Sequence, residues 1–104
     1  MTKVTFYFDE NVPYGFLISG HSGFAENGED IVCASISSAG FMVANTITEI
    51  LKVNAKIDVN DGRMKLIVNK EQRHITKDIL LGLKLHLESL AEQYPEFLET
   101  LTEV

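Results

Sequence analysis

The chain has 104 residues, of which 45% are hydrophobic and 23% charged, and this balance is typical of one soluble globular domain over residues 1–104. The net charge of −6 disfavours nucleic-acid phosphate as the main partner, because such binding depends on clustered Lys and Arg, and it is compatible with a basic peptide or protein. The one cysteine excludes an internal disulfide and suits a reducing cytoplasm, and no apolar stretch approaches the roughly 20 residues that span a membrane.

Alternating apolar residues predict an antiparallel hairpin at the start of the chain. Residues 4–8 place Val and Phe on one face and Thr and Tyr on the other, which is the period of a strand. Residues 9–13 are turn-like, and a second alternation follows over residues 14–18. We therefore expect the chain to reach Gly20 at the end of the second strand.

A loop and a long helix are expected next. Residues 22–29 are typical of a loop, in which Gly23 and Gly28 permit backbone angles that other residues avoid, so this segment can move. Asp30 is a good helix N-cap, because its carboxylate can accept hydrogen bonds from the first free N–H groups of a helix. The helix is then expected over residues 31–52.

The first helix is expected to be apolar on all sides. No charged residue lies between Asp30 and Glu49. A helix without a charged face is expected to be buried on most sides. The small residues of its first half, among positions 34–40, would also let another element pack very close to it.

A second hairpin and a second helix follow. Residues 55–59 and 64–68 alternate apolar and polar side chains on either side of Asn60-Asp61-Gly62, which is a strong turn signal. A helix is expected over residues 71–93, and Pro95 stops it. Its apolar face is expected to carry residues at a three-to-four spacing: Ile75, Ile79, Leu83, Leu87, Leu90 and Tyr94.

The tail over residues 96–101 is expected to be a last edge strand. The predicted fold class is therefore α+β. A small mixed or antiparallel sheet, made of two hairpins and this C-terminal strand, is covered by two helices in the order ββαββα(β). No internal repeat and no low-complexity linker interrupts this pattern.

His21 and Cys33 are the candidate catalytic residues. With Asp30 as N-cap, Cys33 is the third helical position, where free N–H groups place partial positive charge that stabilises a thiolate. A nearby imidazole could accept the thiol proton. The charge of Asp30 opposes the thiolate, so its expected role is to fix the helix start or to orient His21. The spacing of twelve residues permits contact between His21 and Cys33 without requiring it.

A purely structural interpretation of these residues stays open. A lone cysteine in an apolar helix is usually a small buried hydrophobe, and a histidine beside a glycine at a strand end is often structural. No metal is expected, because His74 and His86 lie twelve residues apart and no pair has Cys-x-x-Cys or His-x-x-x-His spacing. No cofactor is expected either, since the sequence has no glycine-rich, lysine-terminated phosphate loop.

The motif around these residues resembles the signature of the ribosomal-processing cysteine protease family, called Prp. The motif consists of Gly20-His21-Ser22, a short loop with Gly28, then Asp30-Ile31-Val32-Cys33-Ala34 and Ser37. The resemblance extends over nearly the whole length, from the opening hairpin to a Tyr94-Pro95-Glu96 tail. Ser35 departs from the family, in which Ala or Gly is common there, but one small residue replaces another.

The resemblance implies a function that periodicity does not. Members of this family remove a short N-terminal extension from large-subunit ribosomal protein 27 in Firmicutes and related bacteria, cleaving after a hydrophobic stretch that ends in Phe. They are homodimers, which would account for the uncharged first helix. The expected partners are therefore this extension and a second copy of the chain, with no direct nucleic-acid or membrane binding.

The resemblance also implies roles for individual residues. The family's histidine falls on His21, which Gly20 precedes, and its nucleophile falls on Cys33. The aspartate before the helix falls on Asp30, and the serine one turn after the nucleophile falls on Ser37. A mobile loop is expected to order over the substrate; it includes Ser22, Gly23, Phe24 and Gly28. The thiolate would attack the carbonyl of an aromatic residue, and helix-start N–H groups would stabilise the oxyanion.

Two alternative functions remain open. The first is a noncatalytic binding module for a ribosomal or other basic protein, in which Cys33 is merely buried. The second is a thiol-dependent hydrolase that acts on a non-peptide acyl or amide bond. Alkylation of Cys33 near neutral pH would separate the first alternative from an enzyme, and cleavage assays on peptide and ester sets would test the second.

Overall fold

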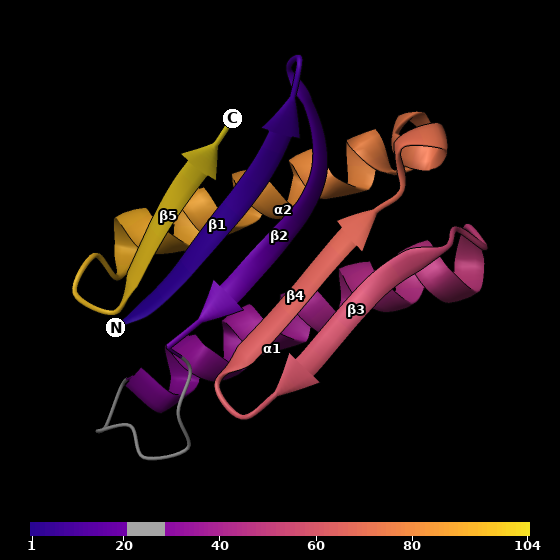
Figure 1. Cartoon of the computed structure of the whole chain (residues 1–104). Coiled ribbons are helices and arrows are strands. Elements are labelled where there is room, and N and C mark those ends of the chain that lie inside the picture. The colour runs from indigo at the N-terminus through magenta and orange to yellow at the C-terminus, as the bar shows by residue number, and fades with distance from the viewer. Residues whose placement is uncertain (21–28) are drawn as a thin grey trace.

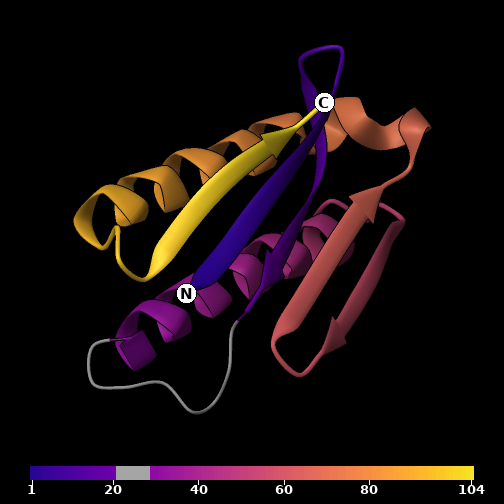
Figure 2. The same ribbon diagram turned by 60° about the vertical axis from the view of Figure 1, so that its left-hand side comes forward.

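The computed structural model describes residues 1–20 and 29–104, which form a sheet and a layer of helices (Figure 1). The elements are β1 (Thr2–Asp9), β2 (Val12–Ser19), α1 (Glu29–Asn45), a π-helical turn (Thr46–Ile50), β3 (Ala55–Asn60), β4 (Arg63–Val68), a 3₁₀ turn (Lys70–Gln72), α2 (Arg73–Gln93) and β5 (Leu98–Glu103). The strands lie in the order β3-β4-β2-β1-β5, and both helices cover the same face of the sheet (Figure 2). The predicted α+β class and element order are confirmed.

The sheet is mixed. β1 pairs antiparallel with β2, and β4 pairs antiparallel with both β2 and β3, whereas β1 and β5 run parallel. The predicted strand at 96–101 is therefore confirmed, slightly further along the chain, as β5. The Thr2 N–H donates to the Phe97 carbonyl at 2.9 Å, so the start of β1 is held beside the start of β5.

Both hairpin turns contain residues with a positive φ. Glu10 and Asn11 have φ of 50° and 67°, as the two central residues of a tight hairpin turn require. This turn is shorter than the predicted 9–13, and Pro13 lies in β2 beside a β-bulge, where a missing N–H is tolerated. In the second hairpin, which is confirmed, Gly62 takes a φ of 72°.

The first helical segment ends irregularly. Its end is close to the predicted Lys52, but the last turn, Thr46–Ile50, is a π-helix. The hydroxyls of Thr46 and Thr48 donate to the carbonyl oxygens four residues earlier, at 2.8 and 3.0 Å, and such bonding disturbs a regular α-helix. Lys52 then takes a left-handed φ of 55°, which ends the segment.

The prediction that the first helix is buried on most sides is wrong. One face of α1 and the π-helical turn enters the core, where Ile36 and Ile47 are fully buried. The opposite face leaves Ile31 69% and Met42 55% exposed. The cause is the two-layer architecture, because the sheet lies on one side of α1 and no other layer in the described part of the chain lies on the other (Figure 2).

The same helical segment qualifies as a membrane span by length and composition. Ile31–Ile50 contains 20 residues with a mean hydropathy of 1.5, so the expectation that no apolar stretch approaches membrane length is wrong on this measure. Core helices of soluble proteins pass the same test. Because Val32, Val43 and Ala44 pack into the hydrophobic core, we interpret this segment as a core helix.

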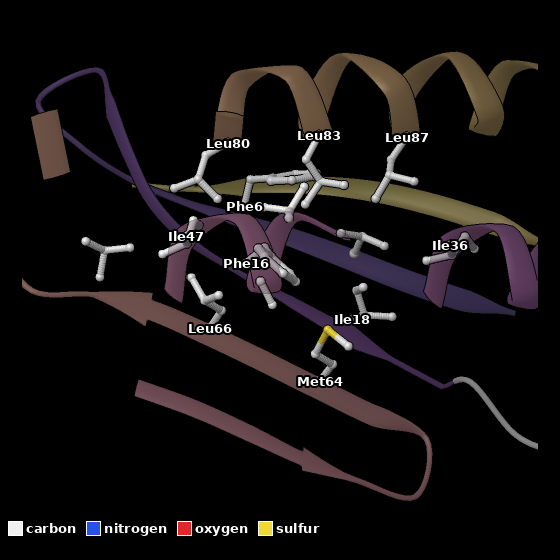
Figure 3. Close-up of a cluster of buried hydrophobic side chains, with 14 of the residues drawn as sticks. Phe6, Phe16, Ile18, Ile36, Ile47, Met64, Leu66, Leu80, Leu83 and Leu87 are labelled. Carbon is white, nitrogen blue, oxygen red and sulfur yellow. The ribbon is translucent and has the colours of Figure 1, made fainter. Parts of the chain in front are cut away.

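The hydrophobic core lies between the sheet and the helices (Figure 3). Phe6 of β1 and Phe16 of β2 are partners in the antiparallel register, and both are almost fully buried. On β3 the expected apolar face is less protected, since Ile57 and Val59 are 39% and 50% exposed. β3 is an edge strand with a single neighbour, and this position explains its weaker burial.

The second helix presents to the core a face that differs in part from the predicted one. Leu83 and Leu87 are buried as expected. Thr76 and Leu80 are buried as well, whereas Ile75 is 41% exposed, so this part of the prediction is wrong. The buried residues still follow a three-to-four spacing. The apolar pattern alone did not fix which of two adjacent rows of helix residues faces the sheet, the row that contains Ile75 or the row that contains Thr76 and Leu80.

Candidate active site

Cys33 lies in α1, at the fifth residue of the helix rather than the predicted third. The helix begins at Glu29, so Asp30 lies inside its first turn, and the prediction that Asp30 is the N-cap is wrong. Acidic residues favour the first turn because they complement the positive end of the helix dipole, so the helix can include both of them. The field of the helix start falls off within the first turn and therefore acts on Cys33 less strongly than predicted.

The Cys33 side chain is buried at the boundary between α1 and the sheet. It is 3% exposed, and its Sγ lies 3.5 Å from the hydroxyl oxygen of Thr2, with either atom able to donate the hydrogen bond. Thr2 opens β1 and is itself fully buried. A peptide carbonyl therefore does not reach the thiol unless the surroundings of Cys33 rearrange.

Gly20 lies beside Thr2, at the corner of the molecule where the start of β1 contacts α1. It follows β2 with a φ of +83°, at which L side chains are strained. A Cβ built on it would lie 2.6 Å from the Met1 carbonyl oxygen and 3.7 Å from the Thr2 Cα. The structure thus brings the residue that precedes His21 beside the residue that contacts Cys33.

Several predicted site residues lie outside the described ranges 1–20 and 29–104. They are His21, Ser22, Gly23, Phe24 and Gly28. The contact between His21 and Cys33 stays a prediction, and so does the covering role of the loop. The described part of the chain contains the predicted site positions Gly20, Asp30, Cys33 and Ser37.

Ser37 lies one turn after Cys33 on α1 and lines a cavity of about 240 Å³. This cavity lies between α1 and the β3–β4 turn, and its wall includes Ile18, Phe41 and Met64. Cavities that hold drug-sized ligands span roughly 300–1,000 Å³. The smaller volume therefore suits one apolar side chain of a peptide better than a complete cofactor.

A larger cavity, of about 560 Å³, lies between α1 and α2. Ser38 and Met42 line it from α1, and Gly82 and His86 line it from α2. Within residues 1–20 and 29–104, no group of three or more His, Cys, Asp or Glu side chains could hold a metal ion. The lining of the cavity is mainly apolar, with polar residues such as Ser38 and His86 beside it, so the cavity is an apolar surface groove with polar edges.

The sheet face that points away from the helices carries an aromatic cluster. Tyr7 stacks on Tyr14 with their centroids 6.0 Å apart, and Lys65 Nζ lies 5.5 Å from the Tyr7 ring centroid. Burial, and then the negative charge of Glu103, raises the pKa of the Tyr7 hydroxyl. Because successive strand residues point to opposite faces, Tyr7 faces away from the core-facing Phe6. This cluster is therefore separate from the Cys33 corner.

Thr2 is the residue at this corner that sequence analysis missed. Its contact with Cys33 joins residues 31 positions apart, and no local pattern reports such a distance. One signal was nevertheless available. Extending the strand alternation backwards from Phe6 and Val4 places Thr2 on the core-facing side, where a hydroxyl needs a partner.

Comparison with known proteins identifies the family. Residues 1–99 match the family model described as Cysteine protease Prp. The ribosomal processing cysteine protease Prp of Bacillus subtilis (strain 168) is 25% identical over 95 residues, which cover 86% of this chain and 85% of that protein.

Solved structures agree with this assignment at the level of the fold. The crystal structure of a ribosomal processing protease Prp from S. aureus, in complex with a substrate peptide, has a TM-score of 0.90 at 21% identity and covers 99% of this chain and 100% of that one. A Streptococcus mutans structure has a TM-score of 0.82 at 25% identity, with coverage of 99% and 96%. By its match over residues 1–99, this chain belongs to the Prp family of cysteine proteases.

Proposed function

We propose that this chain is a cytoplasmic cysteine endopeptidase that removes the N-terminal extension of large-subunit ribosomal protein 27, cleaving after a hydrophobic stretch that ends in Phe. The family match over residues 1–99 carries this proposal, because the matched segment includes both His21 and Cys33. The Bacillus subtilis relative is a ribosomal processing cysteine protease, which supports the substrate class. The S. aureus relative in complex with a substrate peptide supports a peptide as the ligand.

In the proposed mechanism, His21 accepts the proton of the Cys33 thiol, and the thiolate attacks the carbonyl carbon of the aromatic residue before the scissile bond. The new C–S bond forms as negative charge moves to the carbonyl oxygen, where free N–H groups of the first helical turn are candidate donors. His21 then protonates the leaving amine as the C–N bond breaks. Water attacks the thioester, which releases the carboxylic acid product and restores the thiol.

The burial of Cys33 adds a requirement to this mechanism. A thiol that is 3% exposed meets a peptide carbonyl only after its surroundings change. We propose that the segment 22–28 covers the bound peptide. Gly20 would support this segment at the corner beside Thr2, and Ser37 would contact the peptide from the cavity one turn beyond Cys33.

A cleavage assay tests the proposal. The substrate is a synthetic peptide that joins a Phe-ending hydrophobic extension to the first residues of a mature ribosomal protein 27, and mass spectrometry follows the products. Cys33→Ala and His21→Ala are expected to reduce cleavage by about a thousandfold or more while the circular dichroism spectrum is unchanged. The exposed substitution Ser89→Ala on α2 is the control and should cleave at the wild-type rate. Cleavage by Cys33→Ala at that same rate would show that the mechanism is wrong.

The burial of Cys33 also favours a second candidate, a noncatalytic family member that binds a basic protein partner. Iodoacetamide separates the two functions. A catalytic Cys33 should be alkylated near neutral pH faster than an ordinary cysteine, whereas a permanently buried one should stay unmodified until the protein unfolds. The other alternative function, a thiol-dependent hydrolase of non-peptide bonds, is tested by assaying a set of ester substrates beside the peptide.

We also propose that the chain forms a homodimer through the exposed face of α1. This face leaves Ile31, Phe41 and Met42 at 69%, 46% and 55% exposure, and it adjoins the cavity between α1 and α2. Monomeric proteins rarely expose large contiguous apolar patches. Light scattering is expected to give twice the mass of one chain for the wild type and a single chain mass for Met42→Glu. A wild-type monomer at every concentration would contradict this proposal.

A further inference from the structure

Thr2 and Thr76 are the fully buried polar residues in the described part of the chain. A buried hydroxyl is unfavourable unless it makes a hydrogen bond. The Thr2 hydroxyl meets this need at the Cys33 sulfur, 3.5 Å away. Its partner is therefore the sulfur atom that becomes the thiolate nucleophile in the proposed mechanism.

The sheet fixes the position of the Thr2 hydroxyl. The Thr2 N–H donates to the Phe97 carbonyl at 2.9 Å, and Thr2 is in register with Leu98 of β5. On the other side, the next residue of β1 is in register with Ser19 at the end of β2. Gly20 then packs so closely that a Cβ would lie 2.6 Å from the Met1 carbonyl oxygen. Three strands thus hold this hydroxyl in front of α1.

We propose that Thr2 is a positioning residue for the nucleophile: its hydroxyl holds the Cys33 sulfur in place and donates a hydrogen bond to the thiolate. The proposal rests on the proposed function, in which Cys33 is ionised. In the resting protein the thiol can donate to the Thr2 oxygen. When the thiol proton passes to the general base, the hydroxyl hydrogen of Thr2 turns to the sulfur, and the contact is kept with donor and acceptor exchanged.

This exchange favours the charged form of Cys33. A thiolate enclosed between a helix and a sheet is costly without a donor, because it has left water. A hydrogen bond to the charged form stabilises that form relative to the neutral thiol. The helix start contributes less than its sequence suggested, since Cys33 is the fifth residue of α1. A side-chain donor from β1 therefore has a role that the helix does not fill.

Two substitutions at Thr2 separate the hydroxyl from the shape of the side chain. Thr2→Val keeps the branched shape and removes the donor, and Thr2→Ser keeps the donor and removes the methyl group. Thr76→Val is the matched control, because Thr76 is equally buried and its hydroxyl bonds to the Arg73 carbonyl rather than to a thiol. Thr2→Ala, which lacks both groups, is the substitute should Thr2→Val fail to fold.

The measurement is the rate of Cys33 alkylation by iodoacetamide, followed by intact mass from about pH 5 to about pH 9, where a reactive thiol ionises. Thr2→Val is expected to shift the rate profile to higher pH and to slow alkylation about tenfold at its lower end, because one hydrogen bond to a charged group is lost. Thr2→Ser should stay within about twofold of the wild type, and Thr76→Val should match it. In peptide cleavage, Thr2→Val should lower kcat and leave KM nearly unchanged.

The proposal is overturned if the Thr2→Val and wild-type alkylation profiles coincide at every pH, whether both are fast or both are slow. It is also overturned if Thr2→Ser behaves like Thr2→Val, since shape rather than the donor would then decide the rate. Failure of the proposed function gives a different result. In that case the wild type does not cleave the peptide, while the comparison of alkylation profiles still reports on the Thr2 hydroxyl.

Discussion

Two fully buried threonines show how two regions of this molecule use the same side chain differently. In the first turn of α2, the Thr76 hydroxyl donates to the Arg73 carbonyl of its own helix at 3.5 Å. At the start of β1, the Thr2 hydroxyl contacts the Cys33 thiol, 31 positions away in the chain. The first contact satisfies a hydroxyl locally. The second ties a strand to the candidate nucleophile, so it exists only when the sheet and α1 are assembled.

The glycines of these two regions differ in how closely other atoms surround them. Gly20, beside Thr2, has a positive φ and no room for a Cβ. Gly82, on α2, has no atom within 4 Å of a built Cβ. The corner around Cys33 is therefore tightly determined by backbone geometry, and the surface of α2 is not. Glycine-to-alanine substitutions in the two regions should therefore change the free energy of unfolding by different amounts and with opposite sign.

The largest effect is expected from Cys33→Ser, which keeps a small polar side chain beside Thr2 but replaces the sulfur nucleophile. Peptide cleavage should fall by about a thousandfold or more, because a serine hydroxyl lacks the acidity and nucleophilicity of a thiol. Stability to urea should change by only about 1 kcal/mol, since the side-chain volume is nearly kept. Retained cleavage would remove Cys33 from the mechanism.

Gly20→Ala should give the next largest effect. The new Cβ meets the Met1 carbonyl oxygen at 2.6 Å, and the alanine must adopt a positive φ. We therefore expect a loss of about 2 to 4 kcal/mol in the free energy of unfolding. Urea denaturation measures the loss. Cleavage at a temperature where the variant is folded should also fall, because Met1 and Thr2 are displaced next to Cys33. An unchanged midpoint would show that the corner is looser than described.

The two threonines give a smaller and more selective effect. Thr2→Val and Thr76→Val should each lower the free energy of unfolding by about 0.5 to 1.5 kcal/mol, because each removes one buried hydrogen bond. Thermal melts of the two variants should therefore be similar. Only Thr2→Val should alter cleavage. If Thr76→Val altered cleavage to the same extent, the distinction between the two regions would be lost.

The smallest effect is a gain. Gly82→Ala adds a methyl group to an exposed position of α2 with free space around it, and alanine favours the helix. The free energy of unfolding should rise by about 0.5 to 1 kcal/mol, with cleavage unchanged. A rise in the thermal midpoint checks this prediction. A loss of stability would contradict the open space that the structure shows around Gly82.

Much of the fold followed from local periodicity. The two hairpins, the two helices and the last strand are each formed from one continuous stretch of sequence, and their alternation or three-to-four spacing was sufficient to predict them. The exposed face of α1 could not be predicted in this way. An uncharged helix has the same sequence whether one layer or two layers cover it, and the number of layers is a property of the assembled molecule.

The candidate site was predicted only in part, for a similar reason. The sequence placed Cys33 near a helix start, yet the predicted position of Cys33 along α1 was wrong. It is the fifth residue and not the third, because Glu29 and Asp30 both fit a first helical turn. The contact between Thr2 and Cys33 depends on β1 lying between β2 and β5. Since β5 comes last in the chain and pairs in parallel with β1, no local pattern near Thr2 reports it.

The most direct test of the central claim is covalent capture of the nucleophile. A peptide chloromethyl ketone that ends in Phe is incubated with the wild-type protein near neutral pH, and the adduct is located by peptide mass mapping. The thiolate of Cys33 should displace chloride and carry a single adduct, and excess substrate peptide should slow its formation. Peptide cleavage that continues while Cys33 stays unmodified would contradict the account.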